Sequence, residues 1–163
     1  MLVNQGLLDI LVVLTGVVYY AFLCLVYLLR AYEKDSAELM LAPVFSLLLI
    51  PFIGLFIVNI LNGSDIYRPV TLVPMIAYLL YDLWYRLLTK KKPVHHPEKW
   101  PAGLIVYLLL LMVGSIGLNW YGYLVTKMYG IALVACFFIM LGCFGFYQGR
   151  HNRRNKPEQQ ARS

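Results

Sequence analysis

The most informative stretch of this 163-residue sequence is TKKKPVHHPEKW, residues 89–100. Long apolar runs flank it on both sides, and a group of charges this dense cannot lie in the hydrocarbon core of a membrane. The stretch is therefore expected on one face of a bilayer, where it sets the direction of the apolar segments around it. It predicts a membrane protein with several spans but indicates no activity.

The composition supports this class. The chain is 61% hydrophobic and only 13% charged, whereas a soluble domain carries about a quarter charged residues. The net charge of +6 is also compatible with nucleic-acid binding. However, the lysines and arginines lie in gaps between apolar runs and in the tail, not on one amphipathic face. We therefore expect anionic lipid headgroups as the partner, and no nucleic acid.

We predict an all-α integral membrane bundle of five transmembrane helices, because the apolar runs have the length of about 20 residues that crosses a bilayer. The spans are expected at about residues 7–29, 39–61, 69–88, 102–121 and 127–147. The last two come from dividing one long apolar stretch at the polar and aromatic segment 119–127. Residues 1–147 then form a single bundle, and residues 148–163 form a basic tail that is expected to be disordered.

The distribution of positive charge predicts the orientation. With five spans, twelve of the 14 Lys and Arg residues fall on one side, and Arg68 and Lys127 fall on the other. The positive-inside rule then places the N-terminus outside and the C-terminus in the cytoplasm of a multi-pass protein of the cell membrane. Four spans are the fallback, but they would separate the basic tail from the basic stretch. The lysines expected to contact lipid headgroups are Lys90, Lys91, Lys92 and Lys99.

Some polar residues and one proline lie within or at the ends of the first two spans. Asp9, at the start of the first span, is expected to cap the helix and complement its dipole. Tyr19 and Tyr20 lie near the middle, and because a buried phenol needs a hydrogen-bond partner, they are expected to face other helices. Pro51 should kink the second span by leaving the carbonyl of Leu47 without its partner. This kink is read as structural, with a hinge or an ion-coordinating carbonyl as the alternative.

The third span carries an acid and a base. Asp82 and Arg86 are four residues apart on one helical face, so an ion pair at the headgroups is the favoured interpretation. The alternative for Asp82 is a proton or cation site, since ionisable groups inside membranes often mark such paths. Lys127, Asn59 and Asn119 are the further polar candidates for a path of this kind.

Residues that commonly bind metals give only weak signals. The histidines, all outside the spans, are His95, His96 and His151. This placement argues against haem held within the bundle, and only Glu98 is near enough to complete a zinc site. Cys136, Met140 and Cys143 form one stripe of the last span, which could carry copper but more commonly packs helices. We expect no cofactor and no metal, and no nucleotide or nucleophile motif is present.

Small residues indicate close helix packing. Gly114 and Gly117 mark one face of the fourth span, and Gly142, Gly145 and Gly149 mark the fifth. Small residues let helix backbones approach closely in membranes. Together with the short connection, they predict that the last two spans form a tight antiparallel hairpin. They leave open whether a spare face binds a membrane-protein partner or a second copy of the chain.

Three classes of function remain. The favoured one is a non-enzymatic subunit, scaffold or accessory of a membrane assembly, because polar groups within the spans are few. The alternative is a small oligomeric transporter or channel, with Asp82 as its main candidate residue. The last is a membrane-embedded enzyme acting on lipid, with His95 or His96 as the base and the basic stretch as a phosphate-binding edge. An enzyme is the least expected of the three.

Overall fold

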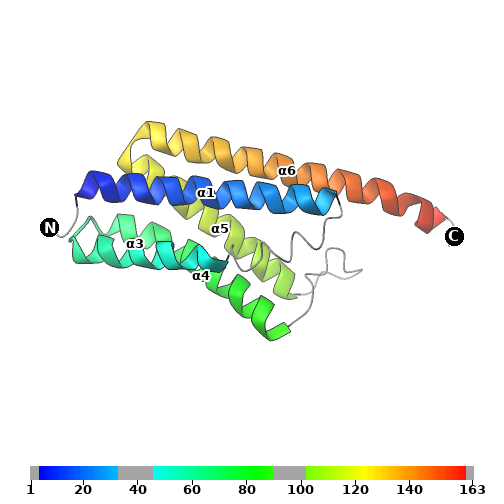
Figure 1. The fold of residues 1–163 in the computed structure, drawn as a ribbon, viewed down its shortest axis with the longest axis horizontal. Coiled ribbons are helices and arrows are strands. Elements are labelled where there is room, and N and C mark those ends of the chain that lie inside the picture. The colour runs from blue at the N-terminus through cyan, green and yellow to red at the C-terminus, as the bar shows by residue number, and fades with distance from the viewer. Residues whose placement is uncertain (1–3, 33–45, 90–101, 161–163) are drawn as a thin grey trace.

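The computed structural model describes residues 4–32, 46–89 and 102–160. Within these ranges the chain is helical and contains no strand, which confirms the predicted all-α class (Figure 1). The helices are α1 (Gln5–Ala31), α3 (Leu49–Leu61), α4 (Tyr67–Thr89), α5 (Ala102–Val125) and α6 (Lys127–Gln160).

Three helices are long and apolar enough to cross a membrane, which is consistent with a membrane location. They are Gln5–Ala31, Ile105–Val125 and Lys127–Arg150. By contrast, α3 has 13 residues, about 20 Å at 1.5 Å per residue, which is shorter than a hydrocarbon core of about 30 Å. The second predicted span, residues 39–61, begins outside the described ranges. α4 has the length of a span but a more polar sequence.

The helices pack as a closed ring. α1 packs on α6, α6 on α5, α5 on α4, α4 on α3, and α3 on α1. α1, α4 and α6 run in one direction and α3 and α5 in the other, so the two ends of the chain lie at opposite ends of the bundle (Figure 1). These directions are the ones that the five-span order requires. Crossing by α3 and α4, and the orientation in the membrane, stay predictions.

The start of α1 differs from the expectation for Asp9. Asn4 is the N-cap, and its side-chain oxygen accepts a hydrogen bond of 2.9 Å from the backbone N–H of Gly6. Asp9 lies more than a turn further on, with its side chain buried between helices. The prediction that Asp9 caps the helix was therefore wrong, because Asn4 directly precedes the first helical residue and supplies the capping oxygen.

The two turns at the N-terminal end of the bundle have clear local causes. Gly63 follows the end of α3 with a φ of 66°, a left-handed conformation that glycine adopts without strain. Thr126 separates α5 from α6, and its hydroxyl accepts a hydrogen bond of 3.2 Å from the N–H of Tyr129. The predicted division of the long apolar stretch within residues 119–127 is thus confirmed, with α5 continuing to Val125.

Pro51 lies next to an interruption in the helical hydrogen bonds. Helical residues end at Leu47, Leu48 forms a turn, and α3 begins at Leu49. Leu48 keeps helical dihedral angles, with φ −62° and ψ −18°. Pro51 has no N–H to donate to the carbonyl of Leu47, and the interruption lies between these two residues. The interruption is consistent with the expected effect of Pro51, and the kink itself stays a prediction.

The last helix is longer than expected. α6 continues through residues 148–160, where the sequence predicted a disordered tail. Each residue added to an existing helix gains one hydrogen bond, whereas starting a new helix fixes several residues for a single bond. Near the start of this extension, the Arg150 guanidinium lies 4.5 Å from the centre of the ring of Tyr32, the residue that follows α1. This cation–π contact holds α6 against the end of α1.

Aromatic residues fill the core. Tyr19 and Tyr20 are completely buried, which confirms that they face other helices. The ring of Tyr19 meets Phe52 of α3 and Tyr78 of α4 edge to face, with centroids 6.3 and 6.2 Å apart. Such rings favour tilted arrangements because their edges are positive and their faces negative. The middle of α1 is therefore held in place by two neighbouring helices.

Glycines bring α5 close to both of its neighbours. Gly114 and Gly117 lie against α4, where a Cβ on Gly117 would collide with the carbonyl oxygen of Thr71. Gly122 lies against Gly130 of α6, where a Cβ on Gly122 would lie 3.0 Å from the Gly130 Cα. The predicted hairpin of the last two helices is confirmed, with Gly122 and Gly130 at its interface. Gly114 and Gly117 face α4 instead.

Candidate functional site

A buried ion pair joins α1 to α4. Asp9 is 5% exposed, and Nη1 of Arg68 lies 2.7 Å from its Oδ1 and 2.6 Å from its Oδ2. The Arg68 side chain is 20% exposed, so it reaches from this pair towards the end of the bundle. A carboxylate in an apolar interior needs such a partner, because the desolvation of an unpaired charge costs several kcal/mol.

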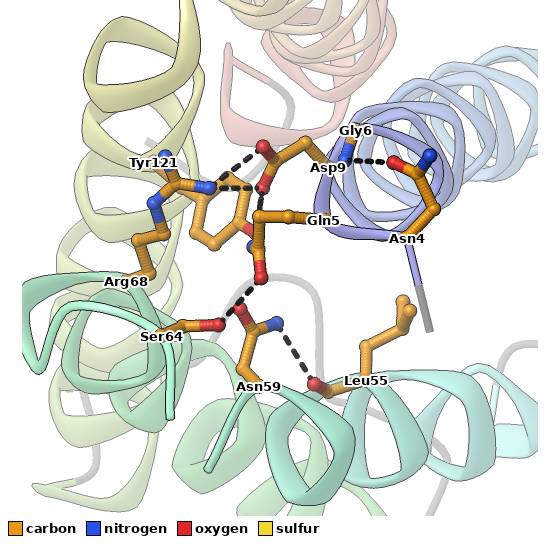
Figure 2. A network of polar contacts seen from close by, with 9 residues as sticks. All are labelled: Asn4, Gln5, Gly6, Asp9, Leu55, Asn59, Ser64, Arg68 and Tyr121. Atoms are coloured by element: carbon orange, nitrogen blue, oxygen red, sulfur yellow. Dashed lines mark hydrogen bonds and ion pairs between the residues drawn. The ribbon is translucent and has the colours of Figure 1, made fainter. Parts of the chain in front are cut away.

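Two further donors complete the shell of Asp9. The hydroxyl of Tyr121 donates to Oδ1 at 2.9 Å, and the amide of Gln5 donates to the same oxygen at 3.1 Å. The hydroxyl of Ser64 then donates to the Gln5 carbonyl oxygen at 2.8 Å. Figure 2 shows these side chains converging from α1, α4, α5 and the turn before α4. We call Asp9, Arg68, Tyr121, Gln5 and Ser64 the Asp9 cluster.

The cluster follows from helix geometry. Gln5 and Asp9 are four residues apart and therefore share one face of α1. Arg68 lies in the first turn of α4 and Tyr121 in the last turns of α5, and these two helices are antiparallel neighbours. The start of α4 and the end of α5 thus meet the start of α1 at one end of the bundle.

Asn59 of α3 lies beside this cluster with part of its amide unused. The residue is 0% exposed, and its Nδ2 donates to the carbonyl of Leu55 at 2.9 Å. Among the described residues, its Oδ1 has no hydrogen-bond partner. In Figure 2 this oxygen is directed towards the Gln5 side of the cluster, and the amide lies close to the Tyr121 hydroxyl. Buried polar atoms are nearly always hydrogen-bonded, so this oxygen marks a place for a donor.

A second polar group lies near the middle of the bundle. The Tyr20 hydroxyl donates to Oδ1 of Asn119 at 2.9 Å and to the carbonyl of Ser115 at 3.3 Å. The Ser115 hydroxyl is buried close to the hydroxyls of Tyr19 and Tyr20. It meets no hydrogen-bond partner within the described ranges. α1 and α5 therefore share polar contacts well inside the apolar core.

A third polar group contains Asp82 and lies further along α4, away from the Asp9 cluster. Asp82 is 3% exposed, so its carboxylate lies inside the protein. Close to it, the hydroxyls of Tyr78 and Tyr107 share a hydrogen bond of 2.7 Å. The side chain of Arg86 is outside the described part, and its pairing with Asp82 stays a prediction.

The other candidate residues fall elsewhere. Lys127 is exposed at the start of α6, outside all three polar groups, so it does not contribute to the interior. The lysines expected to bind headgroups, Lys90, Lys91, Lys92 and Lys99, lie outside the described residues. The same holds for His95 and His96, so the structure does not bear on a lipid-acting enzyme that would use them.

The stripe of Cys136, Met140 and Cys143 lies between α1 and α6. Met140 is buried in the core, and Cys143 faces Cys24 of α1. In the described part of the chain, no group of three His, Cys, Asp or Glu residues is arranged to hold a metal ion. The stripe thus forms part of the packing between the first and last helices.

The opposite side of α6 is open. Only 17% of the residues in its most apolar stretch of 18 residues are buried, compared with 44% in the corresponding stretch of α1. A Cβ added at Gly142, Gly145 or Gly149 would meet no atom within 4 Å. We call the exposed residues that continue this side of the helix the α6 outer face. They are Met128, Ala132, Ala135, Ile139, Gly142, Gly145 and Gly149.

Sequence reasoning missed the Asp9 cluster. A signal was present, because the five-span order puts the start of the first span and the start of the third on the same side. Asp9 and Arg68, of opposite charge, therefore had to lie at one end of the bundle. No known protein family, curated protein or solved structure matches the chain.

Proposed function

We propose that the protein crosses the cell membrane five times, with its N-terminus outside and its C-terminus in the cytoplasm. Three sufficiently apolar helices support a membrane location. The alternating helix directions in Figure 1 support an odd number of crossings. The concentration of Lys and Arg in alternate gaps supports the orientation.

A reporter that is active only in the cytoplasm, fused after Ser163, should be active. A second fusion, placed after Lys92, should also be active, because both sites follow an odd number of crossings. A fusion after Ser64, between α3 and α4, is the matched control and should be silent. Opposite results for the Ser163 and Lys92 fusions would contradict the five-span order.

We propose further that the protein is a non-enzymatic subunit or scaffold of a membrane assembly. The observation that carries this proposal is the α6 outer face, a continuous row of exposed small and apolar residues on a long apolar helix. Helices associate in membranes chiefly through close packing at small residues. The occupant we propose is a membrane-spanning helix of another subunit. The Asp9 cluster supports this role by holding α1, α4 and α5 in one arrangement behind α6.

Replacing Gly145 by leucine should abolish co-purification of this partner from mild detergent, because the larger side chain keeps the backbones apart. The measurement is affinity purification of tagged protein followed by mass analysis of stoichiometric bands. Gly54→Leu is the matched control, since Gly54 is an exposed glycine on α3 that also has open space around it. Isolation of the wild-type protein as a lone monomer would refute the proposal.

A second candidate function is a small transporter or channel. The specific observation in its favour is the pair of buried carboxylates, Asp9 and Asp82, which lie on different helices. Ionisable residues inside a membrane protein are a standard indication of an ion or proton path. This alternative predicts ion flux by the purified protein in liposomes, whereas a scaffold alone predicts none.

A further inference from the structure

Buried tyrosine hydroxyls lie between the two buried carboxylates. Asp82 follows Arg68, the partner of Asp9, by fourteen residues in α4. This separation is about 21 Å along the helix, a large part of a hydrocarbon core of about 30 Å. We call the intervening residues the tyrosine row. In order from Asp9 to Asp82, they are Tyr121, Tyr20, Tyr19, Tyr78 and Tyr107.

From Tyr20 to Tyr107, successive members of the row contact one another across three helices. The rings of Tyr20 and Tyr19 have centroids 5.2 Å apart, and those of Tyr19 and Tyr78 are 6.2 Å apart. The hydroxyls of Tyr78 and Tyr107 lie 2.7 Å apart, and each could donate to the other. Because these rings pack tightly in the core, their hydroxyls are kept in a fixed order.

Two unsatisfied polar atoms lie beside the remaining gaps of the row. The side-chain amide of Asn59 is close to Tyr121, and Oγ of Ser115 is close to Tyr19 and Tyr20. Oδ1 of Asn59 and Oγ of Ser115 are both buried without a hydrogen-bond partner among the described residues. Buried polar atoms of this kind commonly hold a water molecule. A water at each would connect neighbouring hydroxyls.

We propose that the tyrosine row carries protons between Asp9 and Asp82. The proposal rests on the second proposed function, transport, and names the proton as the species carried. Each hydroxyl accepts a proton from the neighbour on one side while it gives its own proton to the neighbour on the other. Tyr20 donates to Asn119 in the structure, so its hydroxyl turns towards the row for this step. One proton enters at one carboxylate and one leaves at the other, and no other bond changes. A row of single hydroxyls offers no cage of oxygen ligands for a metal cation.

The test uses the full-length protein in liposomes that contain a pH-sensitive dye. A potassium gradient with valinomycin sets the potential that drives protons inward. Wild-type protein should change the internal pH faster than empty liposomes. Tyr78→Phe and Tyr20→Phe should each slow this rate by about tenfold, since the ring remains but the proton carrier is lost. Tyr67→Phe, on a 69% exposed residue outside the row, should keep the wild-type rate.

The possible outcomes separate proton transfer along the tyrosine row from the broader proposal of transport. A parallel arm measures sodium flux in the same liposomes. Sodium flux without proton flux would overturn the proton row while supporting transport, and the absence of both fluxes would overturn both. Proton flux that survives Tyr78→Phe and Tyr20→Phe would also overturn the row. Because the wild-type rate is itself decisive, a variant that fails to fold does not remove the test.

Discussion

Replacing Arg68 by leucine should lower the free energy of unfolding by about 3–5 kcal/mol, the usual effect of removing one partner of a buried ion pair. The substitution leaves the carboxylate of Asp9 in the protein interior without its cation. The hydroxyl of Tyr121 and the amide of Gln5 still donate to it, but neither supplies a positive charge. The loss should therefore exceed that of an ordinary hydrogen bond, about 1 kcal/mol.

Unfolding by a denaturing detergent, followed by circular dichroism, measures this effect. The double variant Asp9→Leu with Arg68→Leu should regain most of the lost stability, because an apolar pair leaves no buried charge. Lys127→Leu removes an exposed cation at the same end of the bundle and should leave stability nearly unchanged. Equal losses in the single and double variants would show that burial of an unpaired charge is not the cause.

Replacing Gly117 by alanine should lower stability by about 2–3 kcal/mol, in the range of overpacked cores. The added methyl group would collide with the backbone carbonyl oxygen of Thr71, whereas the ring of Pro74 would lie at an ordinary contact distance of 3.7 Å. The Thr71 carbonyl is not the flexible end of a side chain, so α4 and α5 would have to move apart. The same unfolding measurement applies.

Gly142→Ala is the matched control for Gly117→Ala. Gly142 is also a glycine within an apolar helix, but a Cβ there has no atom within 4 Å. Alanine favours helix over glycine by about 1 kcal/mol, so this variant should be as stable as the wild type or more stable. Similar losses at both positions would indicate that helix contact at Gly117 is not what limits the side chain.

The helices themselves could be predicted from the sequence because each apolar run carries its own signal. The division between the last two helices at Thr126 was predictable from a cluster of polar and aromatic residues. Gly63, Thr126 and the other turn residues act within a few positions, so they too can be read locally. The interruption at Leu48 also has a local signal, because Pro51 has no N–H to donate to the carbonyl of Leu47.

The candidate site was only partly predictable because its contacts join residues far apart in the chain. Tyr19 and Tyr20 could be placed inside, since a phenol near the middle of a span needs a partner. Asp9 was misread because a carboxylate near a helix start suits a cap equally well. Its actual partners, Arg68 and Tyr121, are 59 and 112 residues away. Choosing between the two roles required knowing how the helices are arranged.

The contact between the first and last helices has a consequence for biosynthesis. α1 packs on α6, so the surface of α1 that receives α6 stays uncovered until the ribosome has made the whole bundle. In the proposed five-span arrangement, Asp9 enters the bilayer before Arg68 has been translated. A nascent chain at that stage would hold an uncompensated carboxylate, which favours its retention beside the insertion machinery until the third helix arrives.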